Sequence, residues 1–181
     1  MDNNIIYKIL TIDDVNNNLL ENFNRYQEIK KSWCNQNGTW ILVNDNYIID
    51  MDNETKEKEV KYLSRIIREG GYVLGAFDYK KLIGFLVLLT ERFGTKDQYI
   101  ELKLLHISSE YRGMGIGKKL FMLCVERVKE IGINKIYISA NSSEETINFY
   151  INMGCVDAIE INKKIIEERP KDRQMEYIRL V

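Results

Sequence analysis

The sequence has few of the residues that build metal and disulfide sites. It contains one histidine and three cysteines, and no two cysteines stand in C-x-x-C spacing. The cysteines, Cys34, Cys124 and Cys155, are odd in number and far apart along the chain, which argues against a zinc cluster or a disulfide framework. We therefore expect no metal cofactor and a reducing, cytoplasmic location.

The sequence also lacks long apolar runs and an excess of charge of one sign. No stretch approaches the ~18 apolar residues of a membrane-spanning helix, and the N-terminus MDNNIIYKIL has no apolar region typical of a signal peptide. Lysine plus arginine number 26 and aspartate plus glutamate 27, for a net charge of -1. General nucleic-acid binders and proteins of anionic membranes normally carry a marked basic excess. We expect neither nucleic acid nor a membrane as a partner.

The composition that remains is typical of a globular protein. The chain has 181 residues, of which 45% are hydrophobic and 29% charged, enough for one sizeable core. It has a single proline, Pro170, and no internal repeat, low-complexity segment or Pro/Gly/Ser-rich linker. We therefore expect one domain over residues 1–181.

Hydrophobic periodicity predicts different structure in the two halves of the chain. In the first half it predicts an edge strand over 5–12, a loosely helical segment over 14–35, an irregular segment over 36–53 and a charged helix over 54–69. In the second half it predicts strands over 72–77, 82–90, 99–107, 135–140, 155–161 and 175–181, with helices over 114–131 and from a capping box at 142–145 to Gly154. This order predicts an α/β (α+β mixed) fold, a mixed, mostly antiparallel central sheet with helices on both faces.

Three glycines stand at alternate positions in SSEYRGMGIGKKLF, residues 108–121, where a predicted strand meets a predicted helix. A helix N-terminus presents unpaired amides and the positive end of a dipole, so it attracts phosphate. Glycine lets the backbone turn tightly and approach a ligand. With Arg112 before the glycines and Lys118-Lys119 after them, the stretch predicts a phosphate cradle more than a tight turn without a ligand.

The spacing argues against two nucleotide-binding motifs. The dinucleotide fingerprint G-x-G-x-x-G fails because the sixth position, counted from Gly113, is Lys118. No acidic residue ends the next strand, at Ile138-Ser139-Ala140, where that fingerprint expects one. The Walker sequence fails because its first position is Arg112 and its last is Lys119.

The hexapeptide Arg112-Gly113-Met114-Gly115-Ile116-Gly117 resembles the R/Q-x-x-G-x-G/A signature of the GNAT N-acyltransferase superfamily. The resemblance covers roughly residues 72–155, from a hairpin that contains Gly84 to the sequence NFYINMGC. The first 70 residues and the last 25 match only in the order of predicted elements. This resemblance implies a GNAT-like fold and acetyl-CoA as co-substrate.

The resemblance also implies which residues bind coenzyme A. The backbone amides of the glycine turn would bind the pyrophosphate, with Arg112 aiding the phosphates, and the preceding strand would pair with the pantetheine amides. Family members often carry an asparagine where this chain has Ser143. The residues implied are Leu105, His106, Ile107, Arg112, Gly113, Met114, Gly115, Ile116, Gly117, Lys118, Asn141 and Ser143.

Two residues are candidates for catalysis. Tyr150 is similar to the family tyrosine that often protonates the departing thiolate, and the alternative is a buried aromatic beside Phe149. Glu101 stands where some members place a glutamate that accepts the amine proton through water, and the alternative is a paired or solvated strand carboxylate. In regular alternation His106 faces away from Lys103, Leu105 and Ile107, and opposite to Glu101; a bulge would reverse that.

The resemblance predicts an N-acetyltransferase that moves an acetyl group from acetyl-CoA to a primary amine of a small molecule or peptide by direct attack. The alternative is a non-catalytic acyl-CoA-binding or sensing module, which keeps the cradle but needs neither Tyr150 nor Glu101. Homodimers are common among similar proteins, so a homodimer is one expected assembly.

Overall fold

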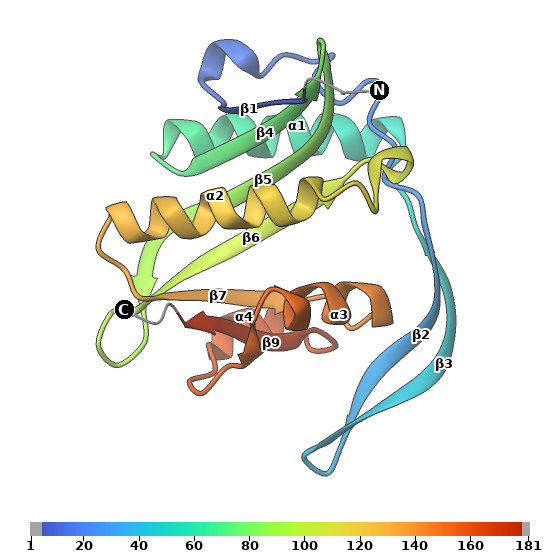
Figure 1. Cartoon of the computed structure of the whole chain (residues 1–181), viewed down its shortest axis with the longest axis vertical. Coiled ribbons are helices and arrows are strands. Elements are labelled where there is room, and N and C mark those ends of the chain that lie inside the picture. Colours follow the sequence, from blue (N-terminus) through green and yellow to red (C-terminus); the bar gives the residue numbers. More distant parts are fainter. Residues whose placement is uncertain (1–4, 179–181) are drawn as a thin grey trace.

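The computed structural model describes residues 5–178, which form a seven-stranded mixed sheet and a separate two-stranded ribbon (Figure 1). The strand order in the sheet is β1-β4-β5-β6-β7-β9-β8. Strands β6 and β7 are parallel, and the other neighbours are antiparallel. The bounds are β1 Ile5–Ile9, β4 Tyr72–Asp78, β5 Lys81–Phe93, β6 Tyr99–Ile107, β7 Lys135–Ala140, β8 Val156–Asp157 and β9 Arg173–Ile178. The predicted fold class, a mostly antiparallel mixed sheet, is confirmed.

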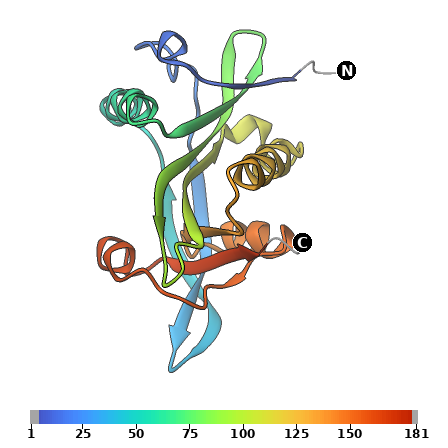
Figure 2. The same cartoon turned by 90° about the vertical axis from the view of Figure 1, so that its left-hand side faces the viewer.

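Helices cover both faces of this sheet (Figure 2). Helices α1 (Asn53–Arg68) and α4 (Lys163–Glu168) lie on one face, and α2 (Ile116–Glu130) and α3 (Glu144–Asn152) lie on the other. Short 3-10 turns, η1 (Ile12–Asp14) and η2 (Ser109–Tyr111), lie in the connections. No helix within residues 5–178 is both long and apolar enough to cross a membrane.

The core consists of two layers on either side of the central strands. Alternate residues of β5 point to opposite faces: Leu86 packs in the cluster beneath α2, and Val87 packs in the cluster beneath α1. Because both faces are covered, β4 and residues 82–88 of β5 are almost continuously buried. This explains why their sequences are apolar runs instead of alternating ones.

Gly84 sets the position of α2. A Cβ on Gly84 would lie 2.7 Å from Cδ1 of Ile107 and 3.3 Å from side-chain atoms of Ile116 and Leu120. Only glycine therefore allows the first turns of α2 to pack this closely on β5. The result is that the N-terminus of α2 lies against the end of β6.

The sequence predicted most of the second half of the chain, with corrections near the C-terminus. Helix α3 begins after Ser143, whose Oγ accepts a hydrogen bond from the Thr146 amide at 3.4 Å; the prediction that the cap is the preceding serine, paired with Glu145, is wrong by one residue. Of the predicted strand over 155–161, only Val156–Asp157 forms a strand. Part of the predicted final strand, residues 179–181, lies outside the described residues.

The prediction for residues 14–53 is wrong, because a β-ribbon occupies the region expected to be helical and irregular. Strands β2 (Gln27–Gln36) and β3 (Thr39–Ile49) form an antiparallel hairpin that extends away from the main sheet (Figure 1). Asn37 (φ 52°) and Gly38 (φ 88°) make its turn, as in the Asn-Gly type I′ hairpin turn. Few ribbon residues are buried, so the ribbon shows little of the periodicity that a core imposes.

The ribbon contacts the start of α3 and strand β9 along its length. The amide of Trp33 donates to the carbonyl of Ser142 at 2.7 Å, and the hydroxyl of Tyr47 donates to Oδ1 of Asn141 at 3.2 Å. Arg173 of β9 lies over the ring of Trp40, with its Cζ 4.6 Å from the ring centroid. The ribbon therefore lies beside the point where β6 and β7 separate.

Candidate active site

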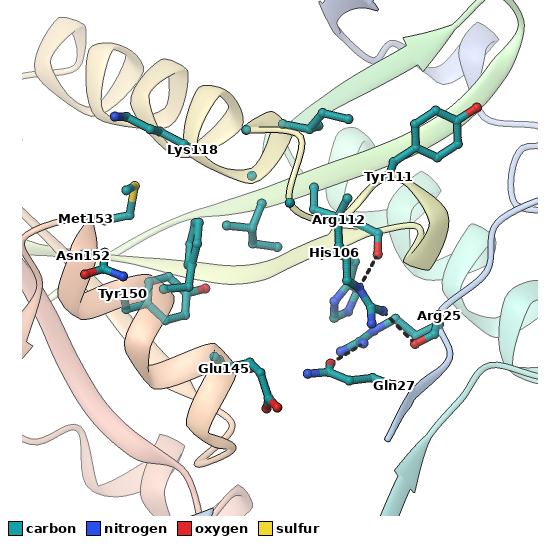
Figure 3. Close-up of a pocket in the computed structure, with 18 residues that line it drawn as sticks. Arg25, Gln27, His106, Tyr111, Arg112, Lys118, Glu145, Tyr150, Asn152 and Met153 are labelled. Carbon is teal, nitrogen blue, oxygen red and sulfur yellow. Dashed lines mark hydrogen bonds between the residues drawn. The ribbon is translucent and has the colours of Figure 1, made fainter. Parts of the chain in front are cut away.

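A cavity of about 460 Å³ lies between the end of β6, the glycine turn and α3 (Figure 3). Its floor is the last part of β6, one side is the start of α2, and the opposite side is α3. The ring of Tyr150 and the side chain of Arg25 lie on opposite sides of it (Figure 3). The lining residues are Arg25, Gln27, Leu105, His106, Ile107, Tyr111, Arg112, Gly113, Gly115, Ile116, Gly117, Lys118, Glu145, Thr146, Phe149, Tyr150, Asn152 and Met153.

The glycine turn presents backbone amides to this cavity. Gly113 and Gly115 have φ values of 77° and 79°, which other residues rarely adopt, and Gly115 is the N-cap of α2. The first amides of a helix have no partner within the helix, so those that follow Gly115 are available to an anion. Lys118 adds a positive side chain on the same wall. The chemistry of this wall fits a phosphate group.

Strand β6 separates from β7 next to the turn. In the described chain, their pairing runs from Tyr99 with Lys135 to Leu102 with Ile138 and goes no further. The backbone of β6 after Leu102 therefore has an unpaired edge, which can bond an extended amide-bearing ligand. Together with the amides of the turn, this edge fits the pantetheine and pyrophosphate of coenzyme A.

A β-bulge in β6 decides where His106 points. Leu104 pairs with Val87 and Leu102 with Leu88, so Lys103 is an extra residue. Beyond the bulge the alternation reverses, and His106 lies on the face with Phe85, to which its ring packs edge-on at 5.3 Å.

The His106 imidazole is held neutral by its surroundings. Burial, and to a smaller extent the positive charge of Arg25, lowers the pKa of His106 to about 3. Its Nδ1 is buried without a hydrogen-bond partner in the described part of the chain. A neutral ring with a free nitrogen can accept or donate one hydrogen bond to a ligand.

Tyr150 is held in place by aromatic neighbours on α3 and α2. Its ring centroid lies 5.1 Å from that of Phe149 and 6.2 Å from that of Phe121. The side chain is 6% exposed and lines the cavity. Burial raises the pKa of Tyr150, so its hydroxyl keeps its proton and can act as a hydrogen-bond donor.

The structure brings together most of the residues predicted to bind the cofactor. Met114, Asn141 and Ser143 do not line the cavity: the Met114 side chain is half exposed, and the other two make local hydrogen bonds at the start of α3. The residues that do line it are Leu105, His106, Ile107, Arg112, Gly113, Gly115, Ile116, Gly117, Lys118 and Tyr150.

Glu101 lies before the bulge, on the face of β6 opposite Leu102, and it does not line the cavity. Its carboxylate is 5% exposed and accepts a hydrogen bond from Nη2 of Arg169 at 2.6 Å. Nζ of Lys103 lies 3.3 Å from the same carboxylate. Two cations therefore hold this group beside the point where β6 and β7 part.

Sequence reasoning missed the wall formed by Arg25 and Gln27, and it missed Glu145 of α3 on the opposite side of the cavity. Arg25 and Gln27 stand in the region expected to be helical, so nothing placed them near the glycine turn. The signal that predicts the ribbon is Asn37-Gly38 between runs of strand-forming residues. Residues 5–178 contain no cluster of three or more His, Cys, Asp or Glu side chains that could hold a metal ion.

A family model confirms the resemblance seen in the sequence. The model of the Acetyltransferase (GNAT) family matches residues 11–155. Since this match spans most of the 181 residues, the chain belongs to the GNAT acetyltransferase family. As a member of this family it is an acyltransferase with acetyl-CoA as its co-substrate. No curated protein matches the sequence.

Solved structures share the whole fold at low sequence identity. Nourseothricin acetyltransferase superposes with a TM-score of 0.70 at 15% identity, over 96% of this chain and 98% of that one. A Bacillus anthracis protein described as a streptothricin acetyltransferase, in complex with acetyl coenzyme A, gives 0.68 at 17%, over 95% of both chains. The PaiA N-acetyltransferase of Thermoplasma acidophilum, with coenzyme A, gives 0.59 at 18%, over 97% and 99%. At these identities the likeness shows the fold alone.

Proposed function

We propose that the protein transfers the acetyl group of acetyl-CoA to a primary amine of a small molecule or peptide by direct attack. The observation that carries this proposal is one cavity that combines the amides of the glycine turn, the unpaired edge of β6 and the hydroxyl-bearing ring of Tyr150. In this reaction the amine nitrogen forms a bond to the acetyl carbon, the carbon–sulfur bond breaks, and the thiolate leaves.

The backbone of the glycine turn binds the pyrophosphate in this proposal. The amides of Met114 to Lys118 supply donors at the N-terminus of α2, and the Lys118 ammonium supplies charge. Leu105, His106 and Ile107 line the path from this turn into the cavity, and their backbone pairs with the pantetheine. Asn141 and Ser143 act at a distance, by fixing the start of α3.

Tyr150 is the proposed proton donor to the leaving thiolate. Its phenol ring lines the cavity on the α3 wall. Burial raises the pKa of the hydroxyl, which therefore stays protonated. A positioned acid of this kind contributes roughly 10²- to 10⁴-fold to a rate. The hydroxyl is poised to stabilise charge that develops on sulfur as the bond breaks.

Glu101 is the proposed acceptor of the amine proton, through water. A free alkylamine has a pKa near ~10.4, so the attacking nitrogen must lose a proton at neutral pH. The Glu101 carboxylate lies on the face of β6 opposite Leu102, near the place where the two parallel strands separate. Its partners Arg169 and Lys103 fix its position in this role.

The cysteines favour direct attack over an acyl-enzyme. Burial raises the pKa of the Cys124 thiol, and it raises that of Cys155 to about 12. The thiolate is the nucleophilic form, so neither side chain is activated, and both pack in the core cluster beneath α2 and α3.

The test is a panel of primary amines with acetyl-CoA and detection of the released thiol. Thiol release that depends on one class of amine supports the proposal. Acetyl-CoA binding without release across the panel supports the non-catalytic binding module instead. Sedimentation of the same preparation tests the expected homodimer.

A further inference from the structure

The Arg112 side chain turns away from the glycine turn and binds three backbone carbonyls, and Figure 3 shows the bonds to Ile107 and Arg25. Its Nε donates to Ile107 at 3.2 Å, Nη1 to Tyr26 at 2.9 Å and Nη2 to Arg25 at 3.1 Å. A guanidinium is a rigid planar fork, so these bonds fix its direction. In this position Arg112 supports residues 25–26 instead of reaching toward the phosphate cradle.

Two serines beside Arg112 hold the same segment. The Ser109 amide donates to the carbonyl of Asn24 at 2.8 Å, and the Asn24 amide donates to Oγ of Ser108 at 3.0 Å. We call this set the Arg112 clasp: Arg112, Ser108 and Ser109 bonded to residues 24–26. The clasp connects two parts of the chain that are 84 to 87 residues apart. Because residues 23–26 belong to no helix or strand, these bonds fix where residues 24–26 lie, together with the buried ring of Phe23, which packs on Phe85.

The clasped segment leads directly into the missed wall of the cavity. Arg25 and Gln27 both line the cavity, and Nη1 of Arg25 donates to Oε1 of Gln27 at 3.3 Å. Figure 3 shows the two side chains below His106, across from Tyr150. Any substrate that approaches Tyr150 from this side passes Arg25.

Arg25 is a partly buried cation without an anionic partner. Burial lowers its pKa to about 10, with a further contribution from Arg112, so Arg25 stays charged at neutral pH. Within residues 5–178 it makes no ion pair, although the nearby charge of Glu59 favours its protonated form. Buried charges in proteins are normally paired. Most of the five donors of Arg25 are therefore left for a ligand.

We propose that Arg112 is a positioning residue for the acceptor wall and not a phosphate ligand, and that Arg25 on this wall binds a carboxylate of the acceptor amine. The inference rests on the proposed acetyl transfer, and it names the acceptor class: amines that carry a carboxylate, such as amino acids or peptides. Arginine suits this role because its fork matches a carboxylate with two parallel hydrogen bonds. Phosphate binding is left to the backbone amides and Lys118.

The first experiment separates positioning from phosphate binding with Arg112→Met and Lys118→Met. Both variants and the unsubstituted protein are titrated with acetyl-CoA and with acetyl-pantetheine, which lacks the phosphates. Amide hydrogen exchange is measured on the same three proteins. We expect Arg112→Met to keep the affinity for both thioesters and to speed exchange in residues 24–27. Lys118→Met should lose affinity for acetyl-CoA alone, more so at low salt.

Loss of acetyl-CoA affinity in Arg112→Met with unchanged acetyl-pantetheine affinity would overturn the positioning role. Ser108→Ala serves where Arg112→Met fails to fold. It removes one bond of the clasp, and we expect a smaller increase in exchange over the same residues. Unchanged exchange there would also contradict the clasp.

The second experiment tests the carboxylate with matched amines. With coenzyme A bound, the protein is titrated with phenylalanine against phenethylamine and with lysine against cadaverine. We expect the carboxylate member to bind about tenfold more tightly, and Arg25→Gln to abolish that preference without changing the affinity for coenzyme A. Equal or absent binding of both members, or a preference for the decarboxylated amine, would overturn the assignment. A protein that binds these amines with the expected preference yet releases no thiol would contradict acetyl transfer alone.

Discussion

The two sides of the cavity present different kinds of chemical group to a ligand. On one side, β6 and the glycine turn offer backbone amides and an unpaired strand edge, fixed by α2 packing on Gly84. On the other side, Arg25 and Gln27 offer charged and polar side chains on a segment held by the Arg112 clasp. The backbone side has few ways to vary while the fold is kept. On the other side, a substitution of Arg25 or Gln27 directly changes the chemical groups that face the ligand.

This difference supports the proposed positions of the two ligands of the reaction. A backbone surface suits the part of acetyl-CoA that every member of the family shares, because its donors do not depend on side-chain identity. A side-chain surface suits the acceptor, which has to be distinguished from other amines. Tyr150 of α3 lines the same cavity as both sides, and the proposed mechanism places the acetyl group beside its hydroxyl.

Tyr150→Phe gives the largest expected effect, because it removes the proposed acid without disturbing either side. We expect kcat to fall by about 10³-fold, near the middle of the range for general acids, with little change in the Kd of acetyl-CoA. Tyr137→Phe is the matched control: its buried hydroxyl donates to Gln174 away from the cavity, so kcat should persist. Equal losses of kcat and of cofactor affinity in Tyr150→Phe would refute the proposed role.

Glu101→Gln tests whether the amine proton leaves toward the Glu101 carboxylate. We expect kcat/KM to fall about 10²-fold, at the low end for general bases, because the proton travels through water. Glu168→Gln is the control, since that exposed carboxylate lies 4.0 Å from Lys103. Similar kinetics for both variants would remove Glu101 from the mechanism.

Gly115→Ala weakens the backbone side alone. Alanine at φ 79° costs roughly 1–2 kcal/mol, and the turn relieves this strain by moving its amides. We expect the Kd of acetyl-CoA to rise about tenfold. Gly132→Ala is matched closely: its φ is 73°, it has the same open surroundings, and it lies past the other end of α2. A calorimetric titration in which both variants bind acetyl-CoA equally would show that the turn is not the cradle.

The smallest expected effect is the titration of His106, at the junction of the two sides. Its folded pKa of about 3 lies below the unfolded value near 6.5. As the pH falls from 6.5 to 3, the His106 imidazole binds a proton in the unfolded chain but not in the folded chain. Protonation therefore stabilises the unfolded chain, and the free energy of unfolding decreases over this range.

Because His106 is the only histidine, its imidazole NMR signals are unambiguous, and we expect no titration between pH 8 and 5. Arg112→Met should raise this pKa, since Arg25 and Arg112 both oppose protonation. A transition near 6.5 in the unsubstituted protein would place His106 in solvent and contradict the described site.

The same contrast explains what could be predicted from the sequence. The glycine turn was readable because Gly113, Gly115 and Gly117 are local signals of backbone geometry. The wall around Arg25 was not readable, because it depends on hydrogen bonds between residues more than 80 positions apart. The local sequence patterns used to predict helices, strands and turns do not indicate such long-range contacts.

The missed ribbon and the direction of His106, which the sequence left open, have distinct physical causes. The ribbon was missed because most of its side chains are exposed, so its apolar residues follow no face of a core. The direction of His106 depends on one extra residue, Lys103, which reverses the alternation of β6. The central strands and α1, by contrast, were predicted well because the core dictates their apolar pattern.

The central claim is that the backbone side of the cavity binds coenzyme A. Calorimetric titration of the purified protein with acetyl-CoA, with ATP and NAD as controls, tests it most directly. We expect micromolar binding of acetyl-CoA and none of either control. A folded protein that does not bind acetyl-CoA, or that binds ATP or NAD equally well, would contradict this assignment and the residue roles that follow from it.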